Sequence, residues 1–159
     1  MPDMLVKLYD LPDSRPIMVK MEEQGITIRR AIAPEKHVVL DWIKENFGEG
    51  WMSEADVAIC NHPSTCVIAV DEAQGKLVGF ACYEATNKDF FGPTGVHPEY
   101  RGRGIGKALL VAAMEGLRDL GYAYAIIGGA GPTEFYARSV GAIPIPDSVP
   151  GIYRGMLKR

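Results

Sequence analysis

The sequence contains few cysteines, no long apolar run and no excess of positive charge. Cys60, Cys66 and Cys82 include no C-x-x-C pair, and an odd number of cysteines favours reduced thiols over a disulfide framework. No stretch approaches the roughly 20 apolar residues of a membrane-spanning helix, and the first residues carry charge early, unlike a leader peptide. The net charge of −3 gives no support for nucleic-acid binding. We therefore expect a soluble, cytoplasmic protein with no nucleic-acid or membrane partner.

The length and composition predict one compact domain. The chain has 159 residues, of which 47% are apolar and well spread, and it shows no internal repeat or linker. We expect a single domain over residues 1–159, with residues 1–25 as an N-terminal extension packed on it. The loop 60–66 places two thiols close to His62, but a metal site would need a fourth ligand. We predict no metal and interpret these cysteines as small apolar residues between a helix and a strand.

Hydrophobic periodicity and turn residues predict alternating strands and helices along the whole chain. The helix 104–120 is the longest, with Ile105, Leu109, Leu117 and Leu120 among the residues on its buried side. The strands that we expect are an edge strand at 4–9, then 26–32, 65–70, 76–84, 90–97, 122–127, 142–145 and 151–157. The other helices are expected at 17–24, 33–47, 53–60 and 132–140.

The segment 96–110 contains the clearest functional motif. Glycines 102, 104 and 106 alternate with the cations Arg101, Arg103 and Lys107, directly before the helix 104–120. The first turn of a helix has free backbone N–H groups, and its dipole favours negative charge there. Glycine also lets backbone approach an oxygen closely, because it has no Cβ. The segment therefore predicts a binding site for a phosphorylated ligand.

Two nucleotide motifs do not fit this segment. A P-loop needs a glycine five residues before the Gly-Lys pair and a hydroxyl after it, but Arg101 and Ala108 stand at these positions. A Rossmann fingerprint needs G-x-G-x-x-G. When the motif starts at Gly102, its last position is Lys107, and when it starts at Gly104, its last position is Leu109. The pattern Arg/Gln-x-x-Gly-x-Gly/Ala does match residues 101–106 without a gap.

This match resembles the acetyl-CoA-binding signature of the GCN5-related N-acetyltransferase (GNAT) family, and the element order over residues 26–157 is similar to that of the family. The resemblance implies an α+β fold, in which helices flank a central mixed, mostly antiparallel sheet that is splayed at the CoA site. It implies acetyl-CoA as the cosubstrate and the backbone N–H of Val96 as the donor that polarises the thioester carbonyl. The cofactor-binding residues that it implies are Thr94, Gly95, Val96, Arg101, Gly102, Arg103, Gly104, Ile105, Gly106 and Lys107.

The segment 135–142 resembles a second family motif, Phe-Tyr-x-x-x-Gly-Phe. The resemblance implies that Tyr136 is the general acid that protonates the leaving thiolate of CoA; the alternative is a core tyrosine on an amphipathic helix. Two positions depart from the family, because Gly129 replaces a frequent asparagine and Ala142 replaces the usual aromatic residue.

The general base is less well defined, because the segment 90–96 lacks the glutamate that family members often carry there. Glu84 is the best carboxylate substitute and Asp89 the next, with a water relay open to either. For each single carboxylate, a surface role is the alternative. We expect Glu99, Glu134 and His97 to be surface or loop residues.

The acceptor is the part of the reaction on which the sequence is least informative. We expect its site between the helices 33–62, the segment 84–93 and the C-terminal strands, and the acidic balance favours a cationic amine. The aromatic residues that line the site or belong to the core are Trp42, Trp51, Tyr83, Phe90, Phe91 and Tyr153.

The function that we predict is acetyl-CoA-dependent transfer of an acetyl group to a primary amine of a small molecule or peptide, by direct attack in a ternary complex. A non-catalytic acyl-CoA-binding sensor is the alternative, and a nucleotide-binding protein ranks below both. A homodimer stays open. Gly104→Val is expected to abolish CoA binding by placing a Cβ where a phosphate must approach.

Overall fold

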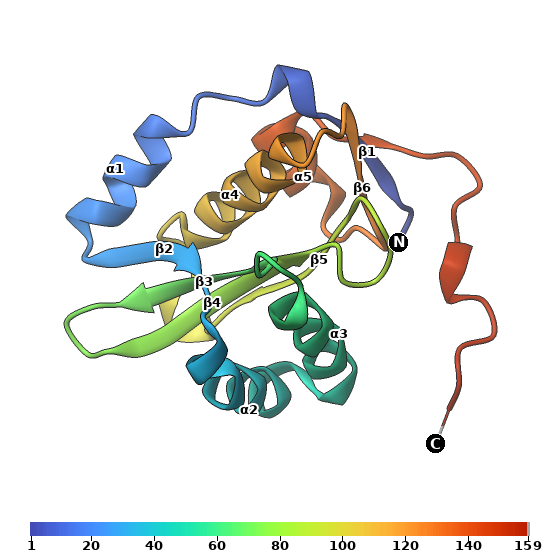
Figure 1. Ribbon diagram of the computed structural model, residues 1–159. Coiled ribbons are helices and arrows are strands. Elements are labelled where there is room, and N and C mark those ends of the chain that lie inside the picture. Colours follow the sequence, from blue (N-terminus) through green and yellow to red (C-terminus); the bar gives the residue numbers. More distant parts are fainter. Residues whose placement is uncertain (159) are drawn as a thin grey trace.

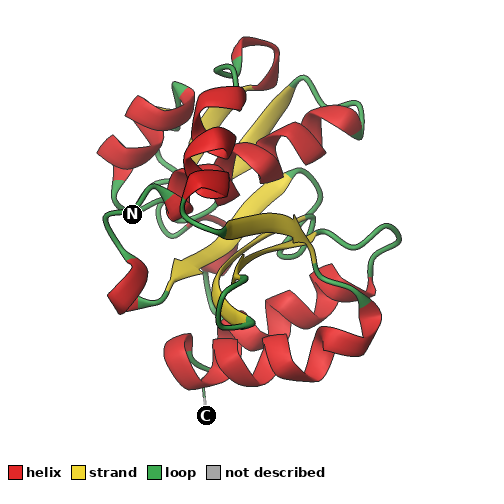
Figure 2. Cartoon of the chain, turned by 90° about the vertical axis from the view of Figure 1, so that its left-hand side faces the viewer, coloured by secondary structure: helices red, strands yellow, loops and turns green. Residues whose placement is uncertain are grey.

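The computed structural model describes residues 1–158, which form one sheet covered by helices on both faces (Figures 1 and 2). The seven strands lie in the order β2-β3-β4-β5-β6-β1-β7. All neighbouring pairs are antiparallel except β5 and β6, which are parallel. The predicted α+β fold with a mixed, mostly antiparallel sheet is therefore confirmed. The strands are β1 (Met4–Lys7), β2 (Ile26–Arg30), β3 (Cys66–Asp71), β4 (Lys76–Tyr83), β5 (Phe90–Val96), β6 (Tyr124–Ile127) and β7 (Ile143–Pro144).

The helices divide into two groups, one on each face of the sheet (Figure 1). On one face lie α1 (Arg15–Glu23), α4 (Ile105–Asp119) and α5 (Thr133–Val140), and on the other lie α2 (Lys36–Phe47) and α3 (Glu49–Cys60). Each group covers its own hydrophobic cluster. In β3, Val67 and Ala69 belong to the first cluster, while Cys66 and Ile68 belong to the second. Both faces of the central strands are therefore buried, which explains why they are almost continuously apolar.

The helix α4 is the centre of the larger cluster. Ile105, Leu109 and Leu117 are buried as predicted, and Gly121 follows the helix with φ of +103°. The predicted burial of Leu120 is wrong, because its side chain is 50% exposed beyond the last turn. Residues 110, 111, 113 and 114 are also buried, since α4 packs on the sheet on one side and against α1 on another.

The two ends of the chain differ most from the expected elements. The segment 4–9 is not an edge strand, because β1 lies between β6 and β7 and pairs with both. The strand expected at 151–157 is also wrong: Gly151–Tyr153 is a short 3₁₀ helix, and the residues after it have no regular structure up to 158. Gly151 and Gly155 lie within this segment with φ of +63° and +70°, which is far from the extended backbone of a strand.

None of the helices in residues 1–158 has both the length and the apolar character needed to cross a membrane.

Candidate active site

The glycine-rich loop ends at the N-terminus of α4, as expected. Gly104 caps the helix with φ of +86°, a left-handed conformation that favours glycine. The first hydrogen bond of the helix runs from the N–H of Ala108 to the carbonyl of Gly104, at 3.1 Å. The backbone N–H groups of Ile105, Gly106 and Lys107 therefore lie at the open end of the helix, where they can donate to an anion.

A cavity of about 620 Å³ opens in front of this helix end. Arg101, Lys107 and Arg138 line it, and no carboxylate does so among the described residues. The cavity is positively charged and can accept a phosphorylated ligand. Its other lining residues are Phe47, Trp51, Thr94, Gly95, Val96, Tyr100, Gly102, Gly104, Ile105, Gly106, Gly131, Pro132, Phe135 and Tyr136.

All the predicted cofactor-binding residues except Arg103 line this cavity. The guanidinium of Arg103 instead lies over the ring of Tyr100, 4.6 Å from its centre. The carbonyl of Arg103 accepts a hydrogen bond from Gln24 Nε2 at 3.0 Å, which ties the loop to the end of α1. The structure therefore brings nine of the ten residues together and gives Arg103 a place outside the cavity wall.

Strand β5 offers free backbone groups to the same cavity, because it separates from β6. The two strands pair only at Phe90 and Phe91, and β5 then continues beside β4 alone within the described chain. The N–H of His97 donates to the carbonyl of Val78 at 2.8 Å. Hydrogen-bonded and non-hydrogen-bonded pairs alternate along antiparallel strands, so the N–H of Val96 points away from β4. The carbonyl of Val96 points the same way and accepts from Arg101 Nε at 3.3 Å.

The glycines of the loop have different surroundings. A Cβ on Gly104 would lie 3.2 Å from both Ile17 Cδ1 and Lys20 Nζ, and the φ of this residue is already unfavourable for a side chain. The expectation that this Cβ would occupy the place of a phosphate is therefore wrong, because it points at α1. Gly106 has ordinary helical backbone and lines the cavity, and its Cβ would meet other atoms only at 3.8 Å.

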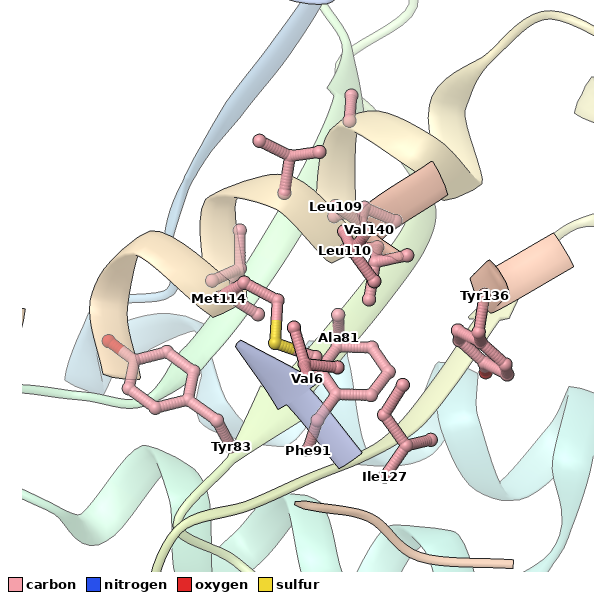
Figure 3. Close-up of a cluster of buried hydrophobic side chains, with 14 of the residues drawn as sticks. Val6, Ala81, Tyr83, Phe91, Leu109, Leu110, Met114, Ile127, Tyr136 and Val140 are labelled. Atoms are coloured by element: carbon pink, nitrogen blue, oxygen red, sulfur yellow. The ribbon is translucent and has the colours of Figure 1, made fainter. Parts of the chain in front are cut away.

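Tyr136 lines the cavity and lies at the margin of the larger hydrophobic cluster (Figure 3). Its side chain is 6% exposed, and its ring makes edge contacts with Phe91 and Phe135, with ring centres 6.2 and 5.1 Å away. Within residues 1–158, its hydroxyl has no hydrogen-bond partner. Burial raises the pKa of this phenol above its usual value. The hydroxyl therefore stays protonated at neutral pH and can donate a proton.

A second cavity, of about 330 Å³, adjoins the first. The two share Trp51, Thr94, Gly131 and Tyr136 as lining residues. Of the aromatic residues expected at an acceptor site, Trp51, Phe91 and Tyr153 line this second cavity, whereas Trp42, Tyr83 and Phe90 do not. The other lining residues are Met1, Glu54, Thr86, Gly92, Pro93, Ile127, Gly128 and Gly129.

Glu84, the expected base, is not brought near Tyr136. It lines a different cavity, beside the C-terminal end of α4. Its two carboxylate oxygens are both engaged, one by the hydroxyl of Tyr122 at 2.7 Å and the other by the N–H of Asp89 at 2.5 Å. Burial and the charge of Glu84 raise the pKa of Asp89 to about 6, but Asp89 lines neither of the two adjoining cavities. The assignment of the base to Glu84 stays a prediction, and its contacts favour a role in shaping the 84–90 turn.

Glu54 and Arg138 are the charged residues of the two cavities that the sequence analysis missed. Arg138 lies two residues after Tyr136 on α5 and adds a cation to the first cavity. Glu54 lies one helical turn after Trp51 on α3, and both line the second cavity. The sequence does contain one signal for Glu54, because a carboxylate three residues after a tryptophan lies on the same face of a helix. Only the fold, however, shows where this face lies relative to the glycine-rich loop.

The remaining candidates lie away from the two cavities. Glu99 and Glu134 are exposed, as expected, and His97 Nδ1 accepts from the N–H of Glu99 at 3.2 Å. Cys66 is buried opposite Cys82, while Cys60 is exposed at the end of α3. Among residues 1–158, no group of three or more His, Cys, Asp or Glu side chains is arranged to hold a metal ion.

Solved structures of other proteins have a fold similar to that of this chain. A fungal multi-domain GH3 β-N-acetylglucosaminidase with a GCN5-related glucosamine N-acetyltransferase region has a similar structure, with a TM-score of 0.75 and 19% identity over 91% of this chain and 19% of that one. A GCN5-related N-acetyltransferase from Sphaerobacter thermophilus follows, with a TM-score of 0.70 and 22% identity over 91% of this chain and 48% of that one. This chain thus spans less than half the length of either protein. These likenesses show the fold.

A comparison with curated proteins finds none that matches. The model of the acetyltransferase (GNAT) family matches residues 36–141, which is more than half of the chain and includes both the glycine-rich loop and Tyr136. The chain belongs to the GNAT acetyltransferase family.

Proposed function

We propose that this protein transfers the acetyl group of acetyl-CoA to a primary amine, by direct attack in a ternary complex. The observation that carries the proposal is the pair of adjoining cavities. One is cationic and faces a helix N-terminus, the other is largely apolar, and Thr94 and Tyr136 lie where they meet. Such an arrangement suits a donor and an acceptor that react at the junction.

In this proposal the first cavity holds CoA. The N–H groups of Ile105, Gly106 and Lys107 donate to the pyrophosphate, and Arg101 and Arg138 add positive charge around it. The pantetheine arm follows the free edge of β5 between Thr94 and Val96. This path would bring the thioester to the junction, where Trp51 and Tyr136 belong to both cavity walls.

The chemistry then needs one hydrogen-bond donor for the carbonyl and one acid for the sulfur. The outward N–H of Val96 stabilises the negative charge that develops on the carbonyl oxygen when the neutral amine attacks. The C–S bond breaks as the intermediate collapses, and the Tyr136 hydroxyl gives its proton to the thiolate of CoA. As the intermediate collapses, the nitrogen also loses a proton. A proton from solvent then restores the hydroxyl of Tyr136, so that the protons of this step balance. A substrate that starts as an ammonium ion must first lose one proton to become the neutral amine. The overall reaction then releases this one proton.

A thiol-release assay with Tyr136→Phe tests the proposal. The panel of amines contains phenethylamine, spermidine, glucosamine and a lysine peptide, and calorimetry measures acetyl-CoA binding in parallel. We expect Tyr136→Phe to lower kcat by about 10²-fold or more. The Kd for acetyl-CoA should stay within about twofold, because the substitution removes only a hydroxyl that has no partner in the described chain.

The same assay separates catalysis from simple binding. If the wild-type protein binds acetyl-CoA but releases no CoA with any amine of the panel, the protein is an acyl-CoA-binding module and the proposed transfer is wrong. Turnover that is equal in wild type and Tyr136→Phe would remove Tyr136 from the mechanism.

A further inference from the structure

The second cavity contains a carboxylate that is placed to act on an amine. Glu54 is half-buried on α3 and lines this cavity together with the shared residue Tyr136. It is the single carboxylate among the side chains of residues 1–158 that line it. A charged side chain at the wall of a largely apolar cavity is favourable when the ligand brings the opposite charge.

The hydrogen bonds of Glu54 leave one oxygen available. Oε1 accepts from the hydroxyl of Thr86, which belongs to the β4–β5 turn and lines the same cavity. Oε2 has no hydrogen-bond partner in the part of the chain that the structure describes. Thr86 therefore fixes the orientation of the carboxylate, and the second oxygen stays open to accept a proton or an ammonium N–H.

The charge of Glu54 also acts on Tyr153, another residue that lines this cavity. The pKa of Tyr153 is raised by burial first, and then by the negative charges of Glu54 and Asp3. Tyr153 is itself held close to the backbone, since a Cβ on Gly128 would lie 2.5 Å from its hydroxyl oxygen. Glu54 therefore makes the potential in this cavity more negative, in contrast to the cationic cavity of the glycine-rich loop.

The walls between these polar groups are apolar. Trp51, Phe91, Pro93 and Ile127 line the cavity, and the ring of Trp51 is stacked on Phe47 with centres 5.1 Å apart. A volume of about 330 Å³ is at the lower end of the range for small-molecule sites. The lining therefore fits a small molecule with an apolar body and one cationic end.

We propose that Glu54 is the general base of the transfer and that the acceptor is a small primary ammonium ion with an aromatic or aliphatic body. This inference rests on the proposed acetyl transfer and names its acceptor class and its base. Glu54 Oε2 takes one proton from the ammonium group, directly or through one water, and passes it to solvent. The neutral amine then attacks the carbonyl carbon, and Tyr136 protonates the sulfur on the other side of the junction.

The assignment competes with Glu84, and the contacts of the two residues favour Glu54. Both oxygens of Glu84 accept hydrogen bonds from protein groups, and Glu84 does not line the cavity of Tyr136. A general base needs a lone pair that faces the proton it removes. Glu54 lines the cavity and keeps one oxygen without a partner among residues 1–158, whereas Glu84 meets neither condition.

Steady-state kinetics with two nearly isosteric amines test the role of Glu54. Phenethylamine is protonated at neutral pH, whereas the fluorines of its β,β-difluoro analogue make the ammonium far more acidic, so that much of it is already neutral. Glu54→Gln should lower kcat/KM for phenethylamine by about 10²-fold or more and that for the difluoro amine by less than about 10-fold. The two amines differ in nucleophilicity. The ratio of kcat/KM between variant and wild type, taken for each amine separately, is independent of this difference.

Two control variants complete the experiment. Asp56→Asn lies on the same helix, but Asp56 pairs with Lys36 at 2.7 Å on the surface, so activity should stay within about twofold because exposed pairs contribute little. Glu84→Gln should lower kcat/KM for both amines equally if its carboxylate only shapes the turn. An unchanged Kd for acetyl-CoA and an unchanged Tm will show that Glu54→Gln is folded.

The outcomes distinguish this inference from the proposed function. If wild-type protein acetylates phenethylamine and Glu54→Gln does so equally well, or loses equal activity with both amines, Glu54 is not the base. If wild type acetylates the lysine peptide or glucosamine but not phenethylamine, the acceptor class is wrong while acetyl transfer stands. Absence of turnover with every amine would overturn both.

Discussion

At the scale of single residues, Gly104 and Gly106 serve different purposes within one motif. Gly104 provides the left-handed turn that starts α4, and α1 fills the space on its side-chain side. Gly106 has ordinary helical backbone, and the space on its side-chain side belongs to the cavity. A substitution at Gly104 therefore tests folding, whereas a substitution at Gly106 tests ligand binding.

Gly106→Val is expected to raise the Kd for acetyl-CoA by at least about tenfold, which is a loss of about 1.4 kcal/mol of binding free energy. The added side chain occupies the space in which the pyrophosphate must approach the N–H groups of the first turn. Gly50→Val is a matched control, because Gly50 is also the second residue of a helix and has open space around it. Calorimetry on both variants measures the effect. Equal affinity in the Gly106 variant and wild type would place the pyrophosphate elsewhere.

Most residues that line the cationic cavity could be predicted from the sequence, whereas the charged and polar residues of the second cavity could not. The loop 101–107 and Tyr136 are parts of short contiguous motifs, in which local backbone geometry decides the chemistry. Glu54 and Thr86 meet only because α3 and the β4–β5 turn pack at one end of the sheet. No local pattern marks such a pair. Glu84 was predicted because it ends a strand, but the N–H of Asp89 in the turn that follows and the hydroxyl of Tyr122 occupy its two oxygens.

At the scale of elements, the divergence of β5 from β6 creates the junction of the two cavities. The strands pair at Phe90 and Phe91 only, and α3, α5 and the loop before α4 contribute residues around the gap. The helices and the central strands were predictable from their periodicity. The position of β1 inside the sheet was not, because strand order depends on contacts between residues far apart in the sequence.

The start of α2 is joined to β2 by an ion pair whose effect on stability depends on pH. Arg29 holds Glu35 through two hydrogen bonds of 2.8 and 2.6 Å, and the N–H of Ile32 donates to the same carboxylate at 3.0 Å. The hydrogen bonds from Arg29, more than that from Ile32, lower the pKa of Glu35 to about 2. A lowered pKa stabilises the fold above the ordinary value of about 4.5, and this stabilisation is lost as the pH falls toward 2.

Glu35→Gln should lower the free energy of unfolding at pH 7 by about 1–2 kcal/mol, a value reduced for the partial exposure of the pair. The difference between wild type and variant should shrink as the pH falls below about 4.5. Urea unfolding between pH 7 and pH 3 measures it, with Glu45→Gln on the exposed face of α2 as the control. A difference that does not change with pH would show that the charge of Glu35 contributes nothing.

At the scale of the whole molecule, local charge matters more than the net charge of −3. The cations of the loop and α5 gather around one cavity, and Glu54 lies at the other. The two substrates that we propose have opposite charges, so each is attracted to its own cavity and both meet at Tyr136. Composition alone could indicate a cationic acceptor, but it could not place the carboxylate that we propose for its binding.

The most direct test of this account is a crystal structure with phenethylamine and an acetyl-CoA analogue that keeps the sulfur but has a methylene inserted between it and the carbonyl, so that the thioester becomes a ketone. We predict the pyrophosphate at the N–H groups of Ile105–Lys107, the ketone oxygen at the N–H of Val96, the sulfur beside the Tyr136 hydroxyl and the ammonium at Glu54. A pyrophosphate bound away from the start of α4, or a sulfur out of hydrogen-bond reach of Tyr136, would contradict the account.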